Sequence, residues 1–238
     1  MKGYLLAVAL LAGAALLVGC GSGGGAGKTL EKMLPRLVGP AQRYEVRVSG
    51  ASDHRIGGAK VRASRLAAGE GLVLDTVVVD LTEVRFDRDR RELLGVDRAD
   101  FSGILLQEDL NAYLRDRPTL ARDLRVRITP GGAQLRGTAD IPGVRLPLGL
   151  TPDFAMNGSL GVDDMGRLRF EPTHISVVGI EVPSVAAKLL ASQINPLVDL
   201  TRLRLPIHLR SAELGPGEAR LYGRALLRTG AYPDPGRE

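Results

Sequence analysis

Apolar and polar residues alternate along much of the chain, and this period of two predicts β-strands that bury one face. In the first clear example, Tyr44, Val46 and Val48 lie on one side, with charged or small polar residues between them. The alternation is also present from Val144 to Leu150. The pattern therefore indicates a protein built mainly from antiparallel strands.

A long alternating segment at about residues 72–86 changes phase along its length. Val77, Val79 and Leu81 share one side, whereas Val84 falls on the other. One extra residue in a strand produces such a change and bends the strand. The segment is therefore predicted to be a bulged, curved strand.

Three pairs of alternating segments are joined by short turns, and each pair predicts a β-hairpin. The turns are Thr129-Pro130-Gly131-Gly132, Asp163-Asp164-Met165-Gly166 and Gly215-Pro216-Gly217. The paired carboxylates of the second turn also suggest calcium binding or acid–base chemistry. A turn between two alternating strands explains them better.

Two segments have the helical period instead. Leu106, Leu110 and Leu114 recur at a spacing of four, and residues 183–200 carry a second apolar helical face that Pro196 is expected to bend. A shorter helix is predicted at residues 29–38. Many strands with few helices define an α+β fold, in which the two longer helices are available to cover part of the apolar face of the sheet.

The N-terminus has the layout of a bacterial secretion signal. Lys2 precedes an almost unbroken apolar run, which is shorter than the ~20 residues that a membrane-spanning helix needs. The run ends in Leu17-Val18-Gly19-Cys20, which resembles the lipobox of bacterial lipoproteins. We expect cleavage before Cys20 and anchoring by lipid on that cysteine. The expected location is the periplasmic face of the outer membrane if the host has one, and otherwise the outer face of the cell membrane.

Cys20 is the one cysteine of the chain, so no intrachain disulfide can form and the exported part depends on core packing. Residues 21–27 are mostly glycine and are expected to form a flexible tether. The predicted organisation is a signal peptide at 1–19, the lipidated cysteine and tether at 20–27, a single domain at 28–230 and a flexible tail at 231–238.

The chain has a net charge of +5 and a pI near 9.6. Its basic residues are dispersed among acidic ones, as in Asp87-Arg88-Asp89-Arg90-Arg91-Glu92, and there is no tryptophan. This distribution favours a solvated surface with a mild attraction to anionic lipid headgroups, and we expect no nucleic-acid partner.

Catalysis has little support in the sequence. His54, His174 and His208 are scattered, without the spacing of a zinc helix, and neither a nucleophile elbow nor a phosphate-binding loop is present. We therefore expect no catalytic residues, no metal site and no cofactor, and the chain is not expected to be an enzyme.

The order of several short motifs resembles the LmeA-like phospholipid-binding family from about Ala41 to Leu227. These motifs are Val84-Arg85-Phe86-Asp87, then a helix with Gln107-Glu108-Asp109-Leu110-Asn111 and Tyr113-Leu114, and finally Val178-Gly179-Ile180-Glu181-Val182-Pro183 before a helix and the last hairpin. The resemblance implies a fold similar to the tubular lipid-binding superfamily, in which a long, strongly curved antiparallel sheet wraps around one or two amphipathic helices. It also implies a groove for acyl chains.

Leu110, Leu114, Leu189 and Ile194 are the candidates for lining such a groove, although each can equally belong to an ordinary core. Two functions remain open. One is a membrane-anchored lipoprotein that binds phospholipid acyl chains, for lipid carriage or envelope maintenance. The alternative is a structural or protein-interaction envelope lipoprotein with a filled core, whose protein partner the sequence does not identify.

Overall fold

The computed structural model describes residues 28, 30–32, 34–35, 38–52, 54–87, 92–116, 121–139, 152–181 and 184–226. The strands in this part of the chain are β1 (Arg43–Ala51), β2 (Arg55–Ala67), β3 (Val73–Asp87), β4 (Glu92–Leu106), β5 (Ala121–Thr129), β6 (Gly132–Ala139), β7 (Asp153–Val162), β8 (Leu168–Val177), β9 (Ile180–Glu181), β10 (Ile207–Gly215) and β11 (Glu218–Ala225). The helices are α2 (Gln107–Asp116), α3 (Ser184–Ile194) and the 3-10 turn η2 (Leu200–Arg202).

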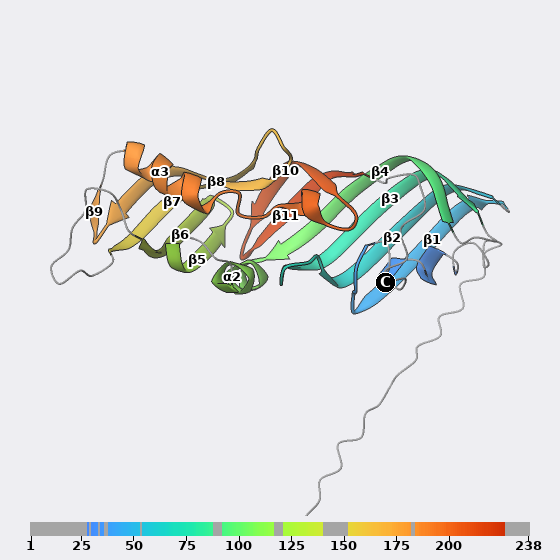
Figure 1. The fold of residues 1–238 in the computed structure, drawn as a ribbon, viewed down its shortest axis with the longest axis horizontal. Coiled ribbons are helices and arrows are strands. Elements are labelled where there is room, and N and C mark those ends of the chain that lie inside the picture. Colours follow the sequence, from blue (N-terminus) through green and yellow to red (C-terminus); the bar gives the residue numbers. More distant parts are fainter. Residues whose placement is uncertain are drawn as a thin grey trace, which may run out of the picture.

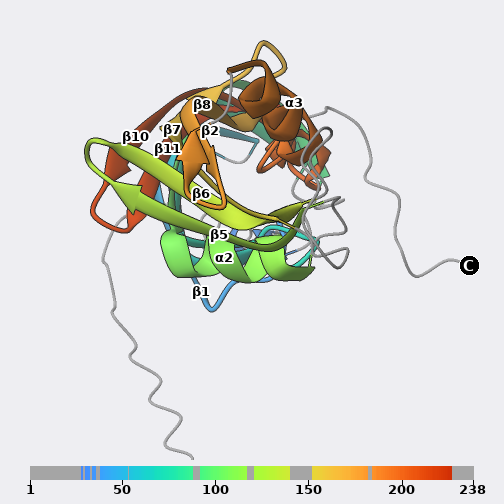
Figure 2. The ribbon, with the colours of Figure 1, turned by 90° about the vertical axis from the view of Figure 1, so that its left-hand side faces the viewer.

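The strands form two antiparallel sheets that follow one another along the long axis of the molecule (Figure 1). Sheet A has the order β1-β2-β3-β4-β11-β10, and sheet B has the order β5-β6-β7-β8-β9. Seen along the long axis, the strands curve around a common interior, with α2 and α3 on opposite sides (Figure 2). All three predicted hairpins are confirmed, as β5–β6, β7–β8 and β10–β11.

The predicted phase change in the long strand is confirmed in β3. Leu81 and Val84 are both buried, and Glu83 between them has a left-handed φ of 54°. The neighbouring strand β2 changes phase at the same level, because Ile56 and Ala59 are buried on either side of two glycines. The register survives, since Ile56 still faces Val84 and Ala59 still faces Leu81. The two strands therefore bend together without loss of pairing.

Polar groups from other elements form hydrogen bonds with the backbone of β5, one edge of sheet B. The side chain of Asn111 accepts a hydrogen bond from the Val126 amide at 2.6 Å and donates one to the Val126 carbonyl at 3.0 Å. The Ile128 amide donates to the side chain of Gln107 at 2.7 Å, and the Ile128 carbonyl accepts from Gly217 at 3.1 Å. Helix α2 and the β10–β11 turn thus cover backbone groups that would otherwise lie open.

The helices differ from their predicted bounds. The helix expected at 106–114 begins at Gln107, because Leu106 is the last residue of β4, and it continues to Asp116. The helix expected at 183–200 ends at Ile194 rather than bending, because Pro196 has no amide hydrogen and disfavours helical backbone at the residue before it. Beyond it, Val198 instead pairs with Leu168 of β8.

One hydrophobic cluster joins both sheets, α2 and α3, and its members run from Leu30 to Ala225. The prediction of many antiparallel strands with few helices is confirmed, although the fold is richer in sheet than the predicted α+β class. The strands form two sheets rather than one wrapped sheet, with α3 beside sheet B and α2 in contact with strands of both sheets. No helix of the described residues is both long enough and apolar enough to cross a membrane.

Several predictions fall wholly or partly on residues outside the described ones. Leu30 and Leu34 are helical and buried, as the short predicted helix requires, but parts of that helix lie outside. The signal peptide, Cys20, the glycine tether, the alternation at 144–150 and the tail at 231–238 also lie outside.

Candidate functional site

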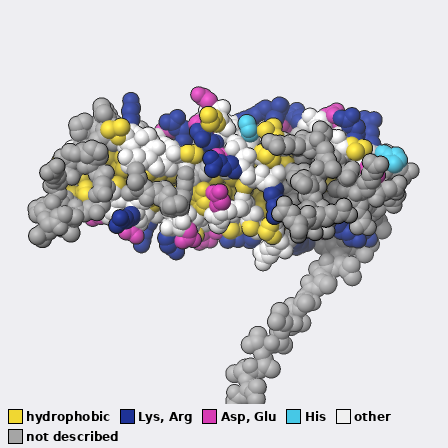
Figure 3. All heavy atoms as spheres, viewed as in Figure 1, with side chains coloured by type: hydrophobic (Ala, Val, Ile, Leu, Met, Phe, Trp, Pro, Cys, Tyr) yellow, Lys and Arg dark blue, Asp and Glu magenta, His cyan; other side chains and the backbone are white. Residues whose placement is uncertain are grey.

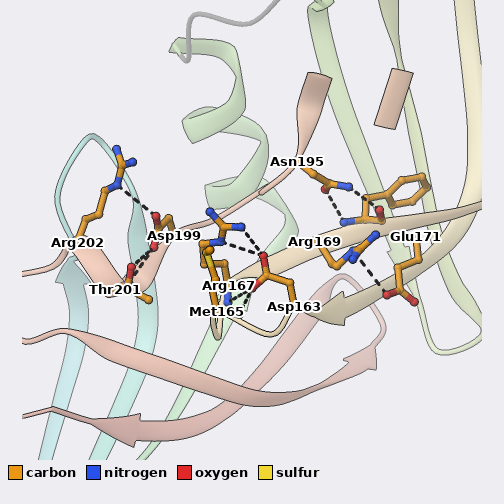
Figure 4. A network of polar contacts seen from close by, with 10 residues as sticks. Asp163, Met165, Arg167, Arg169, Glu171, Asn195, Asp199, Thr201 and Arg202 are labelled. Atoms are coloured by element: carbon orange, nitrogen blue, oxygen red, sulfur yellow. Dashed lines mark hydrogen bonds and ion pairs between the residues drawn. The ribbon is translucent and has the colours of Figure 1, made fainter. Parts of the chain in front are cut away.

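A pocket of about 500 Å³ lies between α3 and β8, a volume within the range of small-molecule sites. Seven of the ten lining residues are charged or polar, and two prolines and an alanine complete the set. The lining residues are Asp163, Arg167, Arg169, Glu171, Pro172, Lys188, Ala191, Ser192, Asn195 and Pro196. Figure 4 shows the polar contacts on the β8 side.

Asp163 and Arg167 form a hydrogen-bonded ion pair in the turn between β7 and β8. One carboxylate oxygen of Asp163 accepts hydrogen bonds from the backbone amides of Met165 and Arg167, at 3.0 and 2.9 Å. The other accepts from the Arg167 guanidinium, at 2.8 Å from Nε and 2.7 Å from Nη2. Burial acts to raise the pKa of Asp163, but these hydrogen bonds and the charge of Arg167 outweigh it, so the pKa is lowered. Asp163 therefore builds the turn, as the sequence predicted.

Asn195 attaches the end of α3 to the outer edge of β8 (Figure 4). Its side chain accepts from the Phe170 amide and donates to the Phe170 carbonyl, both at 2.8 Å. The pairing between Leu168 and Val198 continues this contact, with backbone hydrogen bonds of 3.0 and 3.3 Å. Strands β5 and β8 are thus each bound by an asparagine side chain, which pairs with the strand backbone as a neighbouring strand would.

Two cations of the lining are available for a ligand. Arg169 lies 3.6 Å from Glu171, and both side chains are about half exposed. Lys188 on α3 is exposed and has no ion pair with any residue that the structure describes. The Ser192 hydroxyl donates to the Leu189 carbonyl at 2.7 Å, which leaves its oxygen free to accept. These groups fit a small anionic group, such as a phosphate, that meets guanidinium and ammonium donors.

The four candidates for a lipid groove lie in two places. Leu110 and Leu114 are buried on α2, at 0% and 2% exposure, and Ile194 is buried at the end of α3, at 1%. Leu189 on α3 is 54% exposed. The three buried residues belong to the same hydrophobic cluster, but α2 and α3 flank opposite sides of sheet B (Figure 2). The candidates therefore do not meet in one small site.

The polar residues of the α2 motif have roles that the sequence did not reveal. Asp109, 8% exposed, accepts two hydrogen bonds from the Arg65 guanidinium, at 2.7 and 2.8 Å. Arg65 has a left-handed φ of 51° within β2. The bidentate hydrogen bond with Asp109 raises the pKa of the Arg65 guanidinium. The motif of Gln107, Asp109 and Asn111 thus ties α2 to both sheets. The sequence shows Glu108 and Asp109 beside Gln107, but it does not show what these side chains bind, because the partners of Gln107 and Asp109 lie far away in the chain.

The described residues contain no cluster of three or more histidine, cysteine or acidic side chains that could hold a metal ion. The two acids of the pocket, Asp163 and Glu171, face arginines, and none of the histidines lines it.

The model of the LmeA-like phospholipid-binding family matches residues 24–224. The match covers most of the chain, so the protein belongs to the LmeA-like phospholipid-binding family, and the resemblance inferred from the motifs is confirmed. The family is described by the binding of phospholipid, not by an enzymatic activity, and this supports a lipid ligand. No curated protein and no solved structure gives a significant match.

Proposed function

We propose that the protein is a membrane-anchored extracytoplasmic lipoprotein that binds phospholipid, with the acyl chains against the apolar interior and the headgroup in the pocket between α3 and β8. Membership of a phospholipid-binding family is the observation that carries this proposal. Each methylene removed from water contributes roughly 0.8 kcal/mol, so an apolar interior can hold long chains without any bond being made or broken.

The acyl-chain part of the proposal draws on the apolar residues of the curved sheets. Buried side chains from both sheets and both helices form one continuous cluster, including Phe154, Met156 and Phe170 of sheet B. Leu189 adds an exposed apolar side chain on α3, the helix that carries Lys188 of the pocket. Helix α3 therefore offers an apolar side chain for an acyl chain and a cation for a headgroup.

The headgroup part of the proposal rests on the two exposed cations of the pocket. Arg169 and Lys188 are both exposed, and the one ion pair between them and the described residues is the long contact of Arg169 with Glu171, at 3.6 Å. We therefore expect neither side chain to be needed for the fold. Replacing both by glutamine should lower phospholipid retention without lowering the free energy of unfolding. The matched control replaces Arg43 and Lys60, which are exposed on sheet A. Equal retention in the two double variants would remove the pocket from the proposal.

The membrane-anchoring part of the proposal rests on the sequence Leu17-Val18-Gly19-Cys20. Mass spectrometry of the N-terminal peptide from the full-length protein should find a lipid on Cys20, and Cys20→Ser should release the protein from the membrane fraction. An unmodified cysteine in the membrane-bound protein would overturn this part, without affecting the binding of phospholipid.

The alternative function, an interaction lipoprotein with a filled core, draws on the near-complete burial of Leu110, Leu114 and Ile194. The two functions differ in what the purified protein contains. A carrier retains phospholipid at a fixed stoichiometry or takes it up from vesicles, and a filled core does neither.

A further inference from the structure

The outer face of β5 and β6 carries three arginines in a compact group. Arg125 and Arg127 lie on β5 and Arg136 lies on β6, and all three are exposed, while Val126 between the two β5 arginines is buried. Arg125 and Arg136 are direct cross-strand partners, so they share one face of the sheet. We refer to these three residues as the arginine face.

The arginine face is unfavourable for the isolated fold, because like charges directly opposite each other destabilise a pair of strands. Within the described residues, none of the three arginines forms an ion pair or a side-chain hydrogen bond. In Figure 3, Lys and Arg side chains, with some Asp and Glu side chains among them, follow the lower margin of the molecule, where β5 and β6 lie in Figure 1.

Several exposed basic residues of sheet A, by contrast, form ion pairs with acidic residues of the same sheet. Lys60 lies 3.2 Å from its cross-strand neighbour Asp80. Arg98 pairs with Asp100 at 2.5 Å, and Arg220 pairs with Glu218 at 2.9 Å. Sheet A also has a like-charged cross-strand pair, Arg47 and Lys60, but there Lys60 is paired with Asp80. The dispersed charge predicted from the sequence therefore describes most of the outer face of sheet A but not that of β5 and β6.

The one acid within β5 is removed from the alternation by the backbone. Asp123 has a left-handed φ of 53° and lies where the β5–β6 register shifts between Arg122 and Arg125. It forms no ion pair with any described arginine. The β6 residue opposite Arg125 is Arg136, where an acidic residue would have balanced the charge.

We propose that the arginine face docks the protein on the anionic surface of a lipid bilayer. Arg125 and Arg127 are about 7 Å apart along the strand, and Arg125 and Arg136 are about 5 Å apart across it, so all three charges lie within about one Debye length and act together. Guanidinium groups bind phosphate through paired hydrogen bonds, and the outer side of the β5–β6 pair presents three of them together. This surface is separate from the lipid-binding pocket, and the proposal holds wherever the bound lipid lies.

The test measures vesicle binding by the chain from Lys28 onward, which omits the proposed anchor and keeps the whole described core, since that core runs from Leu30 to Ala225. Flotation is measured with vesicles of phosphatidylcholine alone and of phosphatidylcholine with phosphatidylglycerol, at low and high salt. The test variant replaces the arginine face by glutamine. The control replaces Arg55, Arg98 and Arg220, three exposed, ion-paired arginines of sheet A, and changes the net charge equally. Circular dichroism verifies the fold of both.

The unsubstituted chain should bind the anionic vesicles at low salt, and high salt should release it. Each cation near an anionic surface contributes about five-fold, so the test variant should lose on the order of 100-fold in the partition coefficient. The control should retain most of the binding. Equal losses in both variants would assign the binding to net charge and overturn the proposal. Binding that is unchanged in the test variant, or equal on neutral vesicles, would also overturn it and would leave the arginine face to an acidic protein.

Discussion

Replacing Asn195 by alanine should separate the end of α3 from β8. The substitution removes both partners of the Phe170 backbone groups, each at 2.8 Å, next to a side chain that is 1% exposed. An unpaired buried polar group costs about 1–3 kcal/mol. The pocket admits water to part of this edge, so we expect a loss of about 2–4 kcal/mol in the free energy of unfolding.

The assay is urea unfolding followed by circular dichroism, with Ser192→Ala as the control on the same helix and in the same pocket. The Ser192 hydroxyl bonds only within α3, so its removal should change the free energy of unfolding by less than about 0.5 kcal/mol. An Asn195→Ala variant within about 0.5 kcal/mol of the unsubstituted protein would refute the claim that this amide holds the edge.

Asn195→Asp adds a test by pH. The introduced carboxylate still accepts from the Phe170 amide, but its second oxygen faces the Phe170 carbonyl, so its pKa should be raised above the unfolded value of about 3.9. The folded state then binds the proton more tightly. Stability should be closest to that of the unsubstituted protein below about pH 4 and should fall as the pH rises through the raised pKa. A difference that does not vary with pH would contradict this geometry.

Three further predictions test other parts of the structure. Leu110→Ala should cost about 2–5 kcal/mol, whereas Leu189→Ala, at a 54% exposed residue, should cost under about 0.5 kcal/mol, and similar losses in urea would contradict their assigned environments. Burial raises the pKa of Tyr44 to about 12, above the unfolded value of about 10, so stability should fall as the pH rises from 10 to 12; Tyr44→Phe should flatten that decline, and an unchanged slope would count against it. Because the pKa of Asp163 is lowered, its stabilising contact with Arg167 should be present at neutral pH and lost as the pH falls below about 4. Asp163→Asn should thus lower the melting temperature at pH 7 but not near pH 2, and an equal deficit at both would contradict the ion pair.

The hairpins could be predicted from the sequence because their signals are local. In each hairpin a short turn separates two apolar alternations, as at Pro130-Gly131 and at Asp163, and both strands lie within one window of the sequence. The bend of β3 could also be predicted, because it leaves a visible phase change at Val84.

Strands β2 and β4 were not among the predicted elements, because small residues occupy much of their inner faces. Ala59 and Ala63 of β2 are buried, and in β4 the ring of Phe101 lies over Gly103, where an added Cβ would come within 2.7 Å of it. Alanine and glycine leave little hydrophobic periodicity. The position of these strands is decided instead by long-range pairing, such as that of β4 with β11.

The polar contacts of the site could be anticipated only where they are local. The turn role of Asp163 follows from its neighbours, but Asn195 bonds a residue 25 positions away and Arg65 bonds one 44 positions away. The exposure of Leu189 likewise depends on how α3 lies against β8, since Leu189 follows Val185 at the same spacing of four that joins buried Leu190 and Ile194. The arginine face was hidden because its members come from two strands whose pairing brings Arg125 opposite Arg136.

The central claim is that this protein holds a phospholipid, and native mass spectrometry of the chain from Lys28 onward tests it most directly. The protein is measured as purified and after incubation with phospholipid vesicles, and any bound molecule is extracted and identified. The account predicts a phospholipid at a fixed stoichiometry. A ligand-free mass in both samples would contradict it and would favour an anchored interaction protein with a filled core.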